Sequence, residues 1–383
     1  MTPVALIFSA ALLTGLLALL LWERRARDRA LAAIPIRIHV NGTRGKSTVT
    51  RLIAAALREA GIRTVAKTTG TAPRIILPDG GEQPVRRRAP ASIREQLWLL
   101  REAHRLRATA VVVECMAVDP DLQAVCEDRM IRSTLGVVTN ARLDHAEVMG
   151  TTVDEVAAAL GATVPRSGVL VAGPTAGRDI LLRVAQSRGT RVVRAEADEK
   201  NPEAWASGSW MAENAGIALA VARELGVGDD IARRGMLAAR PDPGALRAGR
   251  IDVEGRRVDY VDASAANDPQ SLGLILGARH DPAVFVFHHR ADRPARLGQF
   301  SEAAPWSQAG DSVIVTGDRP DWATWRRLRA RLPGGRASFT PPGGIAAELR
   351  RRLMVPASPP VVVFCGNTKG IRVDAIVAAL RQA

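Results

Sequence analysis

The chain has 383 residues, of which 47% are apolar, and a formal net charge of +14. This length accommodates two domains with substantial cores, and the apolar content excludes general disorder. The basic excess is almost entirely arginine, because the 53 basic residues include only four lysines. The three cysteines, Cys115, Cys126 and Cys365, have no metal-type spacing. They favour a reducing compartment without a disulfide framework.

Residues 4–21 contain no charged side chain and would span about 27 Å as a helix, close to the thickness of a bilayer core. Trp22 follows at an interfacial position, and the next residues include Arg24, Arg25, Arg27 and Arg29. The positive-inside rule then places the rest of the chain in the cytoplasm. A cleaved signal peptide would need a basic region before the apolar run and a small-residue cleavage site after it, and both are missing.

We therefore predict a single-pass anchor in the cell membrane over residues 1–22 and a basic connector over residues 23–35. The globular part is expected to begin at Ile36 and to owe no core residue to the apolar helix.

The segment 41–48, N-G-T-R-G-K-S-T, follows an apolar strand predicted over residues 36–40 and opens a helical pattern that runs to about residue 60. Backbone N–H groups at such a strand-to-helix turn bind phosphate. An ordinary P-loop has four residues between its glycines, whereas two separate Gly42 from Gly45. We expect Lys46 to contact the β- and γ-phosphates of a nucleotide and the Ser47 hydroxyl to bind Mg²⁺. The predicted nucleotide-binding residues of the loop are Gly42, Thr43, Arg44, Gly45, Lys46, Ser47 and Thr48.

Apolar strands alternate with helical stretches along the rest of the chain, which argues for parallel α/β sheets. A first series of strands is predicted at 36–40, 64–67, 110–114, 135–139, 168–172 and 191–194, and a second at 258–261, 283–287, 312–316 and 361–364. The segment 240–244, R-P-D-P-G, interrupts regular structure between the two series. The predicted fold is an N-terminal transmembrane helix, a P-loop ATP-binding domain over residues 36–243 and a smaller Rossmann-like α/β domain over residues 244–383.

Polar side chains follow two predicted strands of the first series. Glu114 ends the strand at 110–114, and Asn140 and His145 follow the strand at 135–139. The carboxyl ends of parallel strands meet at the ligand-binding edge of such sheets. We therefore expect Glu114 and His145 to act as catalytic residues that help Ser47 to hold a hard cation, and Asn140 to contact the nucleotide.

The short G-T-x-G-K-S loop, the strand-end Glu114 and the N-x-x-x-D-H segment at 140–145 resemble the signatures of the Mur ligase superfamily. The resemblance extends past the domain break. It implies that Arg250, in G-R-x-D, reaches the ATP phosphates as a catalytic residue and that Asp262 and Asn267 hold the nucleoside. Three features depart from the pattern. Ser264 stands where lysine or histidine is usual, Asp268 is inserted before Pro269, and residues 68–199 contain no lysine that could be carbamylated to hold a second metal.

The anchor, the loop, the segment 67–72 (K-T-T-G-T-A) and the strand-end E-C-M-A at 114–117 are together similar to the ligase family of bacterial poly-γ-glutamate synthases. The expected twenty-residue interval between anchor and loop leaves no room for the UDP-sugar domain of peptidoglycan ligases. The resemblance implies ATP and Mg²⁺ as cofactors and an acyl-phosphate mechanism that polymerises glutamate. The implied partners are glutamate, the anionic polymer and membrane subunits of a synthase and export complex, with a homo-oligomer as a further possibility. Six arginines are candidates for binding the polymer: Arg86, Arg87, Arg88, Arg290, Arg293 and Arg296.

Three alternatives stay open at this stage. A membrane-tethered nucleic-acid or transport ATPase would suit the basic charge, but it would need a Walker B aspartate where this chain has Glu114, so no nucleic-acid partner is predicted. A binding scaffold would have no use for the phosphate loop together with Glu114 and His145. A ligase acting on another amino acid shares every motif named above, and the sequence does not separate D- from L-glutamate.

Overall fold

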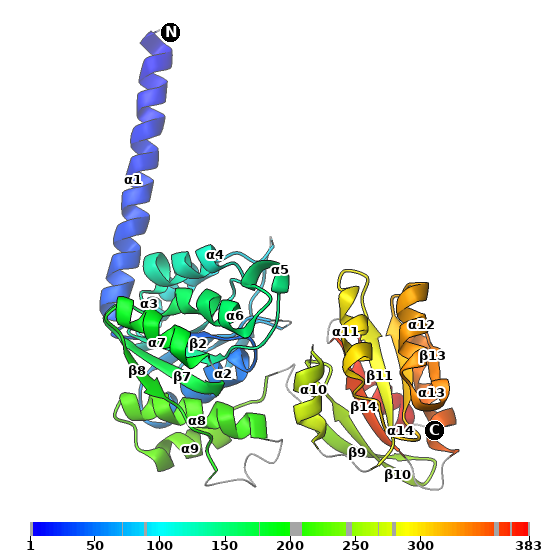
Figure 1. Ribbon diagram of the computed structural model, residues 1–383. Coiled ribbons are helices and arrows are strands. Elements are labelled where there is room, and N and C mark those ends of the chain that lie inside the picture. Colours follow the sequence, from blue (N-terminus) through cyan, green and yellow to red (C-terminus); the bar gives the residue numbers. More distant parts are fainter. Residues whose placement is uncertain are drawn as a thin grey trace. The chain divides into compact units, whose positions relative to one another are not determined.

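The computed structural model describes residues 3–70, 72–87, 90–175, 177–199, 209–242, 247–266, 268–277, 281–355, 360–367 and 370–381. The chain forms two compact units (Figure 1). Residues 1–204 and 212–242 form the first unit and residues 205–211 and 243–383 the second, so the main division lies between Asp242 and Pro243. This division lies one residue before the predicted boundary. Each unit is an α/β layer structure with its own core.

The first unit contains an eight-stranded sheet in the order β4-β3-β2-β5-β1-β6-β7-β8. Six neighbouring strands are parallel to one another: β2, β5, β1, β6, β7 and β8. Strands β3 and β4 are antiparallel to their neighbours and form one edge of the sheet. The strands are β1 (Ile36–Asn41), β2 (Thr64–Lys67), β3 (Arg74–Ile76), β4 (Glu82–Pro84), β5 (Ala110–Glu114), β6 (Leu135–Asn140), β7 (Val169–Thr175) and β8 (Arg191–Arg194). All six strands predicted for this part of the chain are present, and only the short antiparallel pair was not foreseen.

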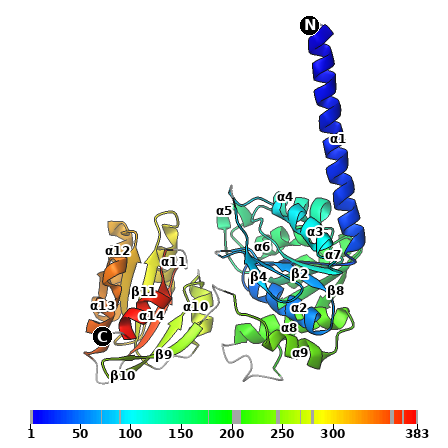
Figure 2. The same cartoon turned by 180° about the vertical axis from the view of Figure 1, so that it is seen from behind.

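Helices cover both faces of this sheet. The helices are α1 (Pro3–Ala33), α2 (Lys46–Glu59), α3 (Glu95–Arg105), α4 (Pro120–Val125), the π-helix η1 (Cys126–Ile131), α5 (Ala146–Met149), α6 (Val153–Leu160), the 3₁₀ turn η2 (Gly161–Thr163), α7 (Arg178–Ser187), α8 (Ser209–Glu224) and α9 (Asp229–Leu237). Figures 1 and 2 show α2, α8 and α9 on one face of the sheet. Helices α3 and α4 lie on the other face, and α1 projects from the unit on that same side.

Helix α1 corrects one sequence-based expectation. It runs without a break from Pro3 to Ala33, so the predicted connector is helical almost to its end. Its last turn and the residue that follows it contribute Ala30, Leu31 and Ile34 to the core between β5, α3 and η1, with exposed fractions of 0%, 8% and 0%. The expectation that the globular part owes no core residue to this helix is therefore wrong, because the helix continues past its apolar stretch and packs on α3.

The second unit contains a six-stranded sheet in the order β13-β12-β11-β14-β10-β9, in which only β9 is antiparallel to its neighbour. Its strands are β9 (Arg247–Val253), β10 (Arg256–Asp262), β11 (Ala283–His289), β12 (Ser312–Gly317), β13 (Ala337–Phe339) and β14 (Val361–Cys365). The helices are α10 (Pro269–Leu276), α11 (Ala295–Ala303), α12 (Trp322–Ala330), the 3₁₀ turns η3 (Pro333–Gly335) and η4 (Pro342–Gly344), α13 (Ile345–Leu353) and α14 (Val373–Arg381). Buried apolar side chains fill both faces of this sheet, as the sequence predicted for a second α/β domain.

Candidate active site

The loop between β1 and α2 has the shape of a phosphate-binding turn. Gly42 and Gly45 have φ angles of 131° and 81°, a region that favours glycine. A Cβ on Gly45 would lie 2.5 Å from the Asn214 side-chain oxygen, so the neighbouring helix α8 also requires glycine there. Helix α2 begins at Lys46, directly after the turn. The N-terminal N–H groups of a 14-residue helix therefore face the loop, as phosphate binding requires.

The Lys46 side chain folds back over this loop. Its Nζ donates hydrogen bonds to the carbonyl oxygens of Gly42, at 2.6 Å, and Thr43, at 3.4 Å. Burial lowers the pKa of Lys46, and the nearby Glu114 carboxylate opposes that effect. The ammonium is thus held in the loop by weak neutral acceptors, which a phosphate can replace with a charged one.

Asn140, at the end of β6, braces the loop from the neighbouring strand. Its Oδ1 accepts hydrogen bonds from the Thr43 hydroxyl at 2.7 Å and the Arg44 N–H at 3.0 Å, and its Nδ2 donates to the Arg44 carbonyl oxygen at 3.0 Å. The Thr139 hydroxyl donates to the same carbonyl oxygen at 2.6 Å. In this structure Asn140 fixes the loop conformation, and its predicted contact with nucleotide stays a prediction.

Glu114, at the end of β5, is brought to the same place. It is 3% exposed, and its Oε2 accepts hydrogen bonds from the Ser47 hydroxyl at 2.8 Å and the Thr69 N–H at 2.6 Å. The Gln96 side chain donates to the Glu114 backbone carbonyl at 3.4 Å. The sequence predicted that Ser47 and Glu114 meet, whereas the contribution of Thr69 was not foreseen because it comes from the backbone.

A hydroxyl and a carboxylate at the rim of a phosphate loop are the hard oxygen ligands that Mg²⁺ prefers, and Mg²⁺ usually completes its shell with water and substrate phosphates. Ser47 and Glu114 fit this requirement. Within the described part of the chain, no group of three or more His, Cys, Asp and Glu side chains could hold a metal ion by itself. The site therefore fits a magnesium ion that shares its ligands with a nucleotide.

The structure does not join His145 to this pair. Its Nδ1 lies 3.4 Å from the Glu147 carboxylate, and its backbone has a φ of 50° before the short helix α5. The adjacent Asp144 instead pairs with Arg44 of the phosphate loop at 3.1 Å. The segment after β6 is thus attached to the loop through Asp144, and a metal-binding role for His145 stays a prediction.

The predicted residues of the second unit lie in local contacts. The Arg250 guanidinium pairs with Asp259 across the β9–β10 hairpin at 2.6 and 3.2 Å, which raises the pKa of Arg250. Asp262 Oδ1 accepts hydrogen bonds from the Ser264 N–H and hydroxyl at 3.1 and 2.6 Å. Asn267 lies outside the described residues. The nucleotide roles of these residues stay predictions.

Two buried ion pairs near the site were not predicted. Lys67 at the end of β2 is fully buried, with Nζ 3.1 Å from Glu95, which also binds Arg87 at 2.7 Å. Burial lowers the pKa of Lys67, and Glu95 opposes it. On β1, buried His39 lies 2.9 Å from Glu127. The rarity of lysine was the only sequence signal for the pair of Lys67 and Glu95. There was no such signal for the pair of His39 and Glu127, because a single histidine within a short strand does not indicate a partner.

The candidate polymer-binding arginines differ in their availability. Arg86 is exposed, whereas Arg88 lies outside the described residues. Arg290 pairs with Asp292 at 2.5 Å, and Arg296 bonds to the Asn367 side chain and the Gly366 carbonyl oxygen. The side chain of Arg296 is therefore engaged within the second unit, which weakens its candidacy for the polymer.

The two units correspond to two known protein families. Residues 40–222 match the Mur ligase middle domain, and residues 249–382 match the poly-gamma-glutamate synthase CapB C-terminal domain. The chain is thus an ATP-dependent ligase of the Mur type, with a fold that joins a P-loop unit to a smaller Rossmann-like unit.

Two curated relatives narrow this class. The chain is 37% identical to the PGA synthase CapB of Bacillus subtilis (strain 168) over 304 residues, which cover 76% of this chain and 77% of the relative. It is 40% identical to the capsule biosynthesis protein CapB of Bacillus anthracis over 309 residues, which cover 78% of this chain and 66% of the relative. The chain belongs to the CapB family of poly-γ-glutamate synthases, as the sequence motifs predicted.

Solved structures confirm the fold. A Mycobacterium tuberculosis folylpolyglutamate synthase complexed with ADP and AMPPCP has a TM-score of 0.64 at 17% identity, with 94% of each chain covered. A bifunctional folylpolyglutamate synthase/dihydrofolate synthase with Mn, AMPPNP and L-glutamate bound has a TM-score of 0.60 at 19% identity, with 94% of this chain and 93% of that chain covered. At these identities the likeness establishes the fold alone.

Proposed function

We propose that this chain activates the γ-carboxylate of a poly-γ-glutamate chain with ATP and joins it to the amine of an incoming glutamate. The observation that carries this proposal is the meeting of Ser47, Glu114 and Lys46 at one phosphate loop. The family membership given above supports the polymer as product, and the glutamate bound to one of the related structures supports the amino acid.

In the proposed reaction the acceptor carboxylate oxygen attacks the γ-phosphorus of ATP, and the bond to the β,γ-bridging oxygen breaks. The acyl phosphate and ADP form. The glutamate amine then attacks the activated carbonyl carbon, the amide bond forms, and phosphate leaves while the amine loses its proton. Phosphoryl transfer of this kind depends mainly on positioning and charge stabilisation.

The residues of the first unit can supply both. Lys46 leaves its carbonyl acceptors and contacts the phosphates, while the helix α2 N-terminus binds them through backbone N–H groups. Ser47 and Glu114 would hold Mg²⁺. A bound Mg²⁺ would neutralise part of the negative charge of the phosphates. The roles of His145, Arg250, Asp262 and Asn267 are retained as part of the proposal. Manganese in a related structure supports a divalent metal.

The proposal also places the chain at the cell membrane through α1. Among the described residues, one helix is long and apolar enough to cross a bilayer, and the candidate span extends over residues 7–33. With the arginines after Trp22 in the cytoplasm, both units face the cytoplasm. Membrane subunits that export the polymer are the proposed partners.

The test measures ADP release by the purified full-length chain in detergent, with a poly-γ-glutamate primer and single amino acids offered one at a time. We expect release that depends on Mg²⁺ and is greatest with glutamate. K46A should reduce ADP release by about 10²- to 10³-fold, because a cationic contact to the reacting phosphates is lost. The matched control is R63A, which removes an exposed cation bonded to the Leu106 carbonyl oxygen. Faster release with another amino acid would replace glutamate in the proposal, and unchanged release by K46A would overturn it.

A further inference from the structure

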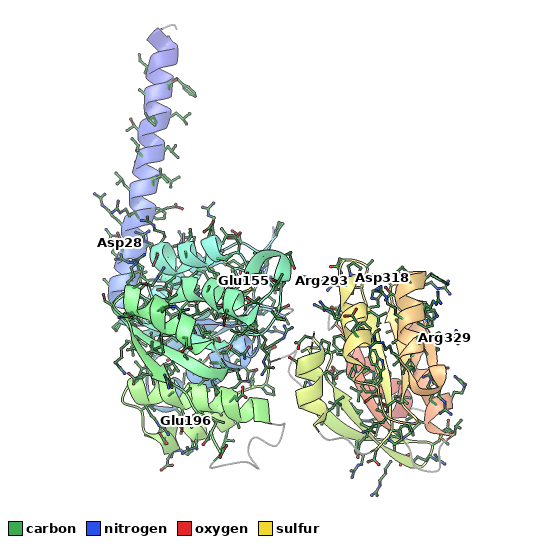
Figure 3. All side chains as sticks on the ribbon, in the orientation of Figure 1. Asp28, Glu155, Glu196, Arg293, Asp318 and Arg329 are labelled. Carbon is green, nitrogen blue, oxygen red and sulfur yellow. The ribbon has the colours of Figure 1, made fainter. Side chains whose placement is uncertain are left out.

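Helix α1 is rigidly attached to the first unit. Ala30, Leu31 and Ile34 are buried in the core, and Arg27 donates a hydrogen bond to the Arg129 carbonyl oxygen of η1 at 3.1 Å. Asp28, labelled in Figure 3, lies where α1 meets the unit and pairs with Arg27 at 2.8 Å. The direction of the apolar span therefore fixes which face of the first unit is turned toward the bilayer.

That face carries α3 and α4 (Figures 1 and 2), and η1 packs against both. Trp22 marks the interface, and the helix rises about 1.5 Å per residue. Arg27 is thus about 8 Å along the helix from Trp22, and its bond to η1 places that part of the unit at the depth of the headgroup layer.

The exposed side of α3 is a stripe of basic and aromatic side chains. Arg94, Trp98, Arg101 and Arg105 follow one another at intervals of four, three and four residues, which places them on one side of the helix, and all four are exposed. Trp98 is 44% exposed although it is a large aromatic residue. Arg105 pairs with Glu102, but this pair is itself exposed and worth little.

A second stripe follows on α4 and η1. Leu122, Val125 and Arg129 are spaced by three and four residues, and the first two are 46% and 38% exposed. Arg24, Arg25 and Arg29 on α1 are also exposed. Exposed tryptophan and aliphatic side chains between arginines are typical of surfaces that bind the interface of an anionic bilayer.

We propose that these two stripes form a membrane-binding face that lies against the anionic inner leaflet. The face consists of Arg94, Trp98, Arg101, Arg105, Leu122, Val125 and Arg129. Trp98, Leu122 and Val125 enter the interfacial layer, and the arginines attract anionic headgroups. The inference rests on the membrane anchor of the proposed function. It goes further in that the catalytic unit is held in one orientation on the bilayer instead of hanging from a tether.

The test uses the full-length chain in vesicles that contain phosphatidylglycerol and a quencher attached to the lipid acyl chains. A fluorophore is attached to cysteine in W98C or L122C. Because Cys115, Cys126 and Cys365 are buried, they should not react with the label in the folded chain. The matched control is L237C. Leu237 is 52% exposed and lies on α9, the helix that covers the opposite face. L16C, within the apolar span, reports insertion of the anchor itself.

We expect quenching at positions 98 and 122 to exceed that at 237, and to decrease when R94E and R101E are combined, because the arginines draw the face closer to the anionic headgroups. R234E, an exposed arginine on α9, should leave it unchanged. Added salt should weaken quenching at 98 but not at 16. Quenching at 16 without quenching at 98 would overturn this inference and leave the anchor standing, whereas no quenching at 16 would overturn the anchor as well. Equal quenching at 98 in vesicles of zwitterionic lipid would remove the anionic lipid from the proposal. Disulfide-linked dimers of unlabelled W98C, together with no lipid quenching of the labelled protein, would assign the face to a second copy.

Discussion

The buried pair of His39 and Glu127 makes the stability of the first unit depend on pH. His39 lies on β1, the strand that leads into the phosphate loop, and its Nδ1 is 2.9 Å from Glu127 Oε2. The other carboxylate oxygen accepts hydrogen bonds from the Ser133 N–H and hydroxyl, both at 2.8 Å. Burial alone lowers the pKa of His39, but the Cys115 thiol and the Glu127 carboxylate raise it to about 9.

This shift sets both the size and the sign of the effect. The usual pKa of histidine is 6.5, so the folded state holds the proton about 2.5 pH units more strongly than the unfolded chain, or ~3 kcal/mol. Because the folded pKa is the higher one, this contribution is fully present below pH 6.5. It is lost as the pH rises from 6.5 through about 9.

The assay is urea unfolding of the full-length chain in detergent between pH 6 and 9.5, with E127Q for comparison. The glutamine keeps acceptors for Ser133 but removes the charge that holds the imidazolium. We expect the wild-type unfolding free energy to fall by ~3 kcal/mol between pH 6.5 and 9, and that of E127Q to fall by less, because E127Q keeps only the Cys115 contribution to the raised pKa of His39. Parallel pH profiles of the two proteins would refute the reasoning.

Three further predictions concern the loop, the metal pair and the anchor. E114Q should raise the Mg²⁺ concentration needed for half-maximal ADP release about 10- to 100-fold, because a charged oxygen is removed from the metal pair; a loss of activity that extra Mg²⁺ does not restore would favour a structural role. G45A should abolish ATP binding in a calorimetric titration, since a Cβ there meets Asn214 at 2.5 Å and the residue has a φ of 81°; wild-type affinity would show that the turn adapts. I34A should lower the unfolding free energy of the first unit by ~2–5 kcal/mol because Ile34 is fully buried. The control L17A, in a residue that is 51% exposed, should not.

Much of the fold followed from the sequence because parallel strands buried on both faces are nearly continuous apolar runs. The phosphate loop was predicted from its two glycines and lysine between a strand and a helix, and Glu114 was predicted because the carboxyl ends of parallel strands meet at one edge of the sheet. The short antiparallel strands β3 and β4 gave no such run, because each has three residues and Gln83 and Pro84 of β4 are exposed. The brace from Asn140 to the loop, and the bond from Thr69 to Glu114, depend on backbone positions that only the folded chain defines.

The continuation of α1 into the catalytic core could not be predicted from the sequence, because an arginine-rich segment after an apolar span reads equally well as a solvated connector. The structure places the end of α1 at Ala33 and the start of β1 at Ile36, and β1 leads directly into the phosphate loop. The candidate membrane helix and the nucleotide site thus share one short, rigid stretch of chain. Since Ile34 is buried in the core between them, the proposed membrane helix would transmit its orientation in the bilayer to the sheet. As a membrane anchor, α1 would do more than retain the enzyme at the bilayer: it would determine the direction in which the catalytic edge of the first unit points.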